Sequence, residues 1–151
     1  MSAVLVALRV PASPEDAFDA FTDEIGQWWQ PGALFQLTPR GDGTLSFENR
    51  ERLITTLASG KVFEIGRVTA WQRGQRLAFT WRQASFAPDQ ITTVEVAFEA
   101  AGSETRVTVT HRGWDTIPQD HVARHGFPLQ ATQMHLANLW RAGLAAFART
   151  L

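Results

Sequence analysis

The segment from residue 92 to residue 112, TTVEVAFEAAGSETRVTVTHR, decides the fold class of this chain. Apolar side chains alternate with polar ones on both sides of Gly102-Ser103, which is the pattern of two strands that each bury one face. Glycine and serine are common turn residues. The segment therefore predicts an antiparallel hairpin from which the rest of a sheet can be traced outward.

Five further stretches carry strand signals. Dipeptides such as Arg73-Gly74 and Pro88-Asp89 separate neighbours at hairpin spacing, which favours an antiparallel meander. These stretches are residues 4–10, 45–47, 53–57, 62–71 and 77–81.

Helices are predicted on both sides of this run of strands. Ser13 can cap a helix that begins at Pro14, and a second short helix is expected after a cap at Thr22-Asp23-Glu24. A short helix is expected near residues 119–124. A long helix of about 22 residues follows from Pro128 and would span about 33 Å, enough to cross a small domain.

The order of these elements predicts an α+β fold with one domain over residues 1–151. A curved antiparallel sheet of about six to seven strands would wrap around the C-terminal helix. Large aromatic side chains at inward positions suggest a shaped interior with a cavity between sheet and helix.

Composition excludes several classes of function. The 151 residues have a net charge of −1 and only one lysine, so neither nucleic acid nor a membrane surface is an expected partner. The chain has no cysteine, which excludes disulfides and thiolate chemistry. No cofactor is expected. Residues 1–10 resemble a strand and not a signal peptide, so a cytoplasmic location is expected.

Four segments of the chain match a known protein family in order and spacing. They are residues 13–18 leading to Trp28-Trp29, then residues 66–71, 77–82 and 105–114. With these segments the chain resembles the SRPBCC superfamily, whose helix-grip fold is shared with START lipid-transfer domains and birch-pollen-allergen-like proteins. It is most similar to the subfamily named for homologues of the activator of the ninety-kilodalton heat-shock-protein ATPase.

The resemblance implies a helix-grip fold with a cavity between the sheet and the long helix. Members of the superfamily include ligand carriers, cyclases and chaperone regulators, so the fold does not fix the function. Many relatives carry a paired glycine before the strand that here contains Arg52-Leu53-Ile54. This chain has none there, which predicts a differently shaped cavity mouth.

Two residues are candidates for catalysis. His111 shares a strand face with Val107 and Val109, so an inward face would present an imidazole to the cavity as a proton donor or acceptor. The alternative is a histidine bonded to a structural partner at a strand end. Glu64 would be a desolvated acid or base if its face is inward, or an exposed residue paired with an arginine if it is not.

The candidate ligand-binding residues are large side chains at presumed inward positions, with ordinary core packing as the alternative for each. They are Phe47, Phe79, Trp81, Phe98, His111, Trp114, Leu136 and Trp140. No metal site is expected. His121 and His125 have helical spacing, but Val122 stands where zinc proteases carry a glutamate.

The sequence leaves three functions open. The first is a protein that binds a hydrophobic small molecule, apolar or amphipathic, in the internal cavity. The second is a cyclase or hydratase that uses His111. The third is a regulatory domain whose partner is a chaperone, and a second copy of the chain is a further candidate partner.

Overall fold

The computed structural model describes residues 3–30, 32, 34–38 and 42–151. Its strands are β1 (Ala3–Val10), β2 (Thr44–Glu48), β3 (Arg52–Thr56), β4 (Val62–Gln72), β5 (Arg76–Trp81), β6 (Thr92–Ala101) and β7 (Glu104–Arg112). Its α-helices are α1 (Pro14–Asp23), α2 (Ile25–Trp28) and α3 (Leu129–Ala148), and its 3-10 helices are η1 (Trp114–Thr116) and η2 (Val122–Arg124).

The strands form one antiparallel sheet with the order β1-β7-β6-β5-β4-β3-β2. Strands β2 to β7 follow the chain as a meander, and β1 closes the other edge by pairing with β7. The predicted α+β class and the meander are therefore confirmed. The hairpin of residues 92–112 is the pair β6–β7, in which Val94 lies opposite His111 and Val96 opposite Val109.

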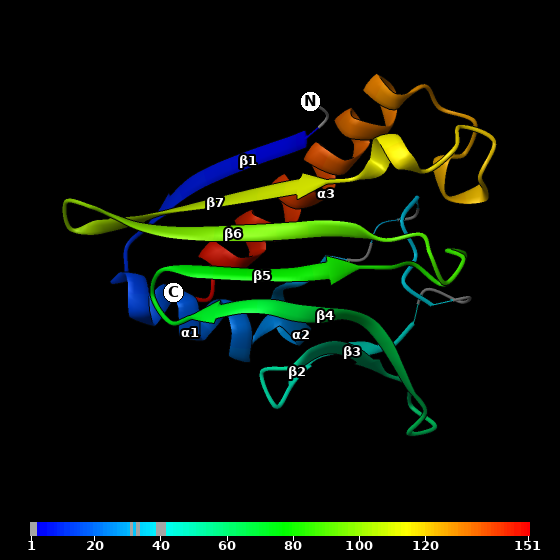
Figure 1. Cartoon of the computed structure of the whole chain (residues 1–151). Coiled ribbons are helices and arrows are strands. Elements are labelled where there is room, and N and C mark those ends of the chain that lie inside the picture. The colour runs from blue at the N-terminus through cyan, green and yellow to red at the C-terminus, as the bar shows by residue number, and fades with distance from the viewer. Residues whose placement is uncertain (1–2, 31, 33, 39–41) are drawn as a thin grey trace.

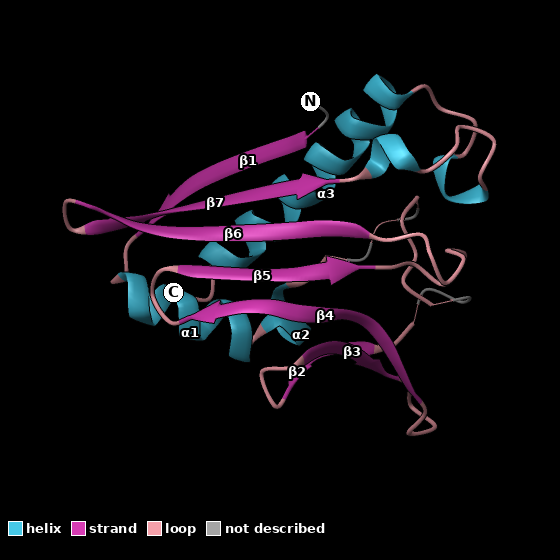
Figure 2. Ribbon diagram, in the orientation of Figure 1, coloured by secondary structure: helices cyan, strands magenta, loops and turns pink. Residues whose placement is uncertain are grey.

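All three α-helices lie on one side of the sheet (Figures 1 and 2). Helix α3 runs diagonally across that side and contacts β1, while α1 contacts β6 and β2, and α2 contacts β2 and α3. Helix α3 buries a face that includes Leu136, Trp140 and Leu144, because these positions recur at helical spacing. The core therefore lies between the concave face of the sheet and the helices, as the helix-grip expectation requires.

Local sequence signals predicted some helix boundaries correctly and others incorrectly. Ser13 caps α1 as predicted, since its Oγ accepts a hydrogen bond from the Asp16 amide at 3.1 Å. The second short helix is confirmed as α2, with Glu24 at its N-cap position, but the predicted side-chain cap is wrong, because Thr22 and Asp23 belong to α1 and Glu24 makes no capping hydrogen bond. Thr22 instead donates to the Phe18 carbonyl within α1. The segment near residues 119–124 forms only the three-residue η2.

A β-bulge in β4 changes which side chains face the core. Leu53 pairs with Gly66 and the next residue, Ile54, pairs with Glu64, so Ile65 has no direct partner on β3. The extra residue interrupts the two-residue period, and both Ile65 and Gly66 are buried. The β4 backbone at Gly66 approaches the carbonyl of Thr80 on β5 closely.

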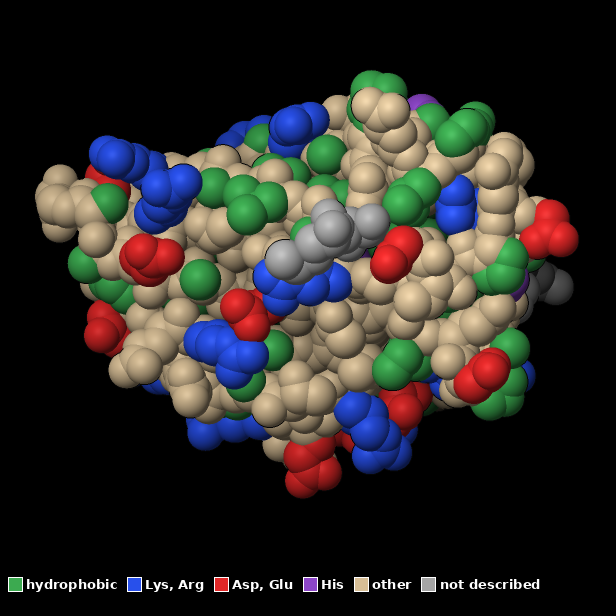
Figure 3. Space-filling model, turned by 45° about the horizontal axis from the view of Figure 1, so that its top comes forward, with side chains coloured by type: hydrophobic (Ala, Val, Ile, Leu, Met, Phe, Trp, Pro, Cys, Tyr) green, Lys and Arg blue, Asp and Glu red, His purple; other side chains and the backbone are tan. Residues whose placement is uncertain are grey.

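Charges of both signs are interspersed over the face shown in Figure 3. Arg73 forms a bidentate ion pair with Asp19 that ties the turn after β4 to α1, and Arg76 pairs with Glu95 across two strands. Within the described part of the chain, no helix is long and apolar enough to cross a membrane.

Candidate ligand-binding site

The residues predicted to line an internal cavity pack against one another. Phe47 is half-buried, and the other seven are buried: Phe79, Trp81, Phe98, His111, Trp114, Leu136 and Trp140. Ring centroids lie 5.9 Å apart for Trp81–Trp140 and 5.6 Å apart for Trp81–His111, which are contact distances for aromatic side chains. The rings of Trp81, Trp114 and Trp140 surround His111, with centroids 5.6 to 6.2 Å from the imidazole.

His111 is held at the centre of this aromatic cluster by hydrogen bonds at both ring nitrogens. Trp140 Nε1 donates to Nδ1 at 3.1 Å. Nε2 lies 2.8 Å from the Thr92 hydroxyl and 3.2 Å from Trp114 Nε1. The Thr92 hydroxyl donates to the Trp81 carbonyl, so its oxygen can accept from Nε2–H. The neutral tautomer with its proton on Nε2 satisfies the most partners.

The surroundings keep His111 neutral. Burial lowers its pKa from 6.5 to about 3, because an imidazolium would lose its hydration. The geometry acts in the same direction, since the second proton of an imidazolium would lie on Nδ1 and point an N–H group at the indole donor of Trp140. His111 therefore carries no proton that it could give up near neutral pH.

Glu64, the other catalytic candidate, is exposed. Its carboxylate lies 3.5 Å from Arg52 Nη1 and 3.3 Å from Arg67 Nη2. The structure thus places Glu64 away from His111, in an ion-pair network on the outer surface, and the two candidates do not form one site.

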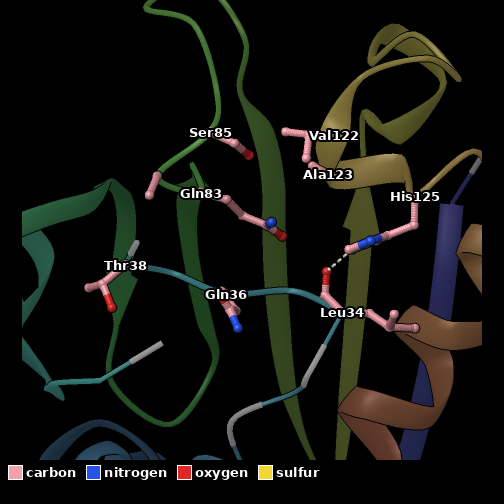
Figure 4. Close-up of a pocket in the computed structure, with 9 residues that line it drawn as sticks. Leu34, Gln36, Thr38, Gln83, Ser85, Val122, Ala123 and His125 are labelled. Atoms are coloured by element: carbon pink, nitrogen blue, oxygen red, sulfur yellow. Dashed lines mark hydrogen bonds between the residues drawn. The ribbon is translucent and has the colours of Figure 1, made fainter. Parts of the chain in front are cut away.

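A pocket of about 360 Å³ lies at one end of the sheet, where three loop segments meet. Figure 4 shows its lining residues, which come from the segment before β2, the segment after β5 and the segment around η2. They are Leu34, Gln36, Thr38, Gln83, Ala84, Ser85, Val122, Ala123 and His125. None of these was predicted from the sequence as a ligand-binding residue.

Hydrogen bonds between loops hold the pocket in shape. His125 Nε2 donates to the Leu34 carbonyl and so joins two walls that lie 91 residues apart in the chain (Figure 4). His121 Nδ1 accepts from the Ala123 amide and caps η2. The two histidines thus have separate structural partners.

The buried guanidinium of Arg124 fastens the η2 wall to the rest of the fold. It donates to the carbonyls of Ile117 and Phe127 at 2.7 and 2.8 Å, and to the Thr132 hydroxyl of α3 at 3.0 Å. These bonds fix the irregular segment between β7 and α3, which has little regular secondary structure of its own.

The sequence patterns did not predict this pocket, because most of its residues lie in loops, which have no periodicity. Gln83 is the exception. It continues the inward alternation of Leu77, Phe79 and Trp81 two residues beyond the end of β5, and it is buried as they are. Extending the strand pattern by one step would have identified it as an inward-facing polar residue.

Comparisons with known proteins agree with this architecture. The model of the family described as "activator of Hsp90 ATPase homolog 1-like protein" matches residues 11–139. No curated protein matches the chain.

Solved structures match over nearly the full length. Protein MLL2253 from Mesorhizobium loti has a TM-score of 0.64 and 17% identity, covering 97% of this chain and 94% of its own. PFC0360w, an HSP90 activator from Plasmodium falciparum, has a TM-score of 0.61 and 18% identity, with coverages of 91% and 89%. Txn09, an anthrahydroquino-gamma-pyrone synthase, has a TM-score of 0.58 and 28% identity, with coverages of 100% and 97%.

Proposed function

The chain belongs to the family of activator of Hsp90 ATPase homolog 1-like proteins, and from this premise we propose that it binds a small apolar or amphipathic molecule in the pocket between Leu34 and Val122. The observation that carries the proposal is the exposed apolar wall of a pocket that hydrogen bonds hold open. Val122 is 68% exposed although it lies beside the buried Ala123.

A ligand that covers the apolar wall around Val122 would bury this side chain, which favours binding. Burying one aliphatic side chain against a ligand contributes about 1.5–3 kcal/mol, so a few such contacts are enough for micromolar affinity. A volume of about 360 Å³ suits a molecule of two or three fused rings. The polar lining residues Gln36, Thr38 and Ser85 would orient it.

One of the comparisons supports a small-molecule ligand. Txn09 is named as an anthrahydroquino-gamma-pyrone synthase, and it shares 28% identity over the whole chain. The likeness to PFC0360w, at 18% identity, extends to the fold alone.

The state of His111 argues against the alternative of a cyclase or hydratase that transfers protons through this residue. A neutral imidazole with a pKa of about 3 is a weak base, and it holds no second proton to donate at pH 7. Binding without proton transfer at His111 is therefore the better proposal.

Replacing Val122 by aspartate should weaken ligand binding at least tenfold while leaving the fold intact. The substitution places a carboxylate in the apolar wall, and Val122 is too exposed to contribute much to stability. Isothermal titration with naphthols, flavonoids, fatty acids and polyketide-like compounds, supported by tryptophan fluorescence, measures the affinity.

Met134→Asp is the matched control, because Met134 is 58% exposed on α3 and is not among the residues that line the pocket. Equal losses of affinity in the two variants would place the bound molecule elsewhere. If no compound binds the folded protein, the proposal is wrong.

A further inference from the structure

We infer that the molecule bound in this pocket carries a neutral hydroxyl group, such as that of a phenol, which donates a hydrogen bond to the side-chain oxygen of Gln83. This inference rests on the proposed function and narrows it to one class of ligand. It separates hydroxylated aromatic compounds from the fatty acids and hydrocarbons that an apolar wall alone would also accept.

Gln83 is an unusual residue for its position. Its side chain is 5% exposed, and its Oε1 atom is buried without a hydrogen-bond partner in the described part of the chain. Glutamine is mostly exposed in folded proteins, and a buried amide oxygen without a partner costs about 1–3 kcal/mol. Such a cost is expected where a ligand supplies the missing donor.

The side chain of Gln83 carries its amide group into the wall of the pocket. The residue follows Trp81 on the inward side of the chain leaving β5, and its amide extends into the space between Gln36, Ser85 and Ala123 (Figure 4). A ligand lying against Leu34 and Val122 would therefore reach the amide from the open side of the pocket.

Trp81, the inward-facing residue two positions before Gln83, also has a buried polar atom without a hydrogen-bond partner among the described residues, but in Trp81 this atom is a donor. The atom is the indole Nε1. Trp81 is not among the residues that line the pocket, so the unpaired acceptor of Gln83 sets the requirement on the ligand, and a hydroxyl group meets it by donating a hydrogen bond.

A carboxylate fits this environment poorly. At neutral pH it has no proton to donate, and its negative charge would face the partial negative charge of the Gln83 oxygen. Arg124, the nearby buried cation, already donates from all three of its side-chain nitrogens to Ile117, Phe127 and Thr132. The pocket should therefore select phenols over the corresponding carboxylates and ethers.

The test compares 2-naphthol with 2-methoxynaphthalene and 2-naphthoate by isothermal titration at pH 7. The three share one ring system, but only 2-naphthol can donate a hydrogen bond. We expect it to bind about tenfold more tightly than either of the others, which corresponds to one buried hydrogen bond.

Replacing Gln83 by methionine should abolish this preference. Methionine keeps the length of the side chain but cannot accept the hydrogen bond, so 2-naphthol and 2-methoxynaphthalene should bind the variant equally. The free variant should unfold at the same temperature as the parent or higher, because the change removes an unpaired buried oxygen. Gln130→Met is the control, since Gln130 is exposed on α3 and is not among the residues that line the pocket.

The outcomes separate the inference from the function on which it rests. Equal binding of 2-naphthol and its methyl ether, lost in Val122→Asp, would overturn the inference and leave the proposed function intact. A clear fall in the melting temperature of Gln83→Met would also overturn it, because Gln83 would then have a structural partner. If neither these probes nor the wider panel bind, the proposed function fails and the inference with it.

Discussion

Replacing Gly66 by alanine is expected to destabilise the protein by about 3–5 kcal/mol, enough to unfold a large share of the molecules. A Cβ atom at this position would lie 1.6 Å from the carbonyl oxygen of Thr80 and 2.6 Å from its carbonyl carbon. Both are backbone atoms, so no side-chain rotation can relieve the clash. The strands β4 and β5 would have to separate at the bulge.

The free energy of unfolding from urea denaturation measures this effect. Gly102→Ala is the control, because no atom lies within 4 Å of the Cβ that would be added there. It has a φ of +66°, so alanine should cost only the left-handed backbone penalty of about 1–2 kcal/mol. A Gly66→Ala variant as stable as Gly102→Ala would show that the close approach of β4 and β5 is not essential.

Stability is expected to fall as the pH drops below 6.5, with His111 as a major cause. The pKa of this histidine is about 3 in the folded protein and 6.5 when exposed, so between these values the unfolded chain binds one more proton. The contribution of neutral His111 to the free energy of unfolding is therefore fully present above pH 6.5, and it is lost as the pH falls. The slope is at most about 1.4 kcal/mol per pH unit, or about 2–3 kcal/mol from pH 6.5 to 4.5.

Urea denaturation of the parent and His111→Gln across this range isolates the contribution, since glutamine does not titrate. The difference in unfolding free energy between the two proteins should shrink as the pH falls, whereas parallel curves would contradict the assignment. NMR of the imidazole nitrogens in the parent gives a test without a variant. His111 should remain neutral at pH 5, with its proton on Nε2.

The sequence determined the elements of the fold because each carries its own local signal. The alternation in residues 92–112 buries Val94, Val96 and Val109 on one face of a hairpin, and Ser13-Pro14 starts a helix without help from distant residues. The side of His111 was also predictable, because β7 keeps a regular two-residue period. In β4 the bulge at Ile65 and Gly66 breaks that period, which is why the sequence left the orientation of Glu64 open.

The environment of His111 and the location of the pocket could not be predicted from local sequence patterns, because both depend on contacts between distant segments. The pKa of His111 is lowered by burial, and the side chains that bury it include Trp114 and Trp140, which lie on other elements and meet it only after folding. The pocket combines segments around Leu34, Gln83 and Val122, whose loops carry no periodic pattern. Periodicity reports which face of one element is buried. The distances between loops depend on how the sheet curves around α3, and this follows from packing across the whole domain.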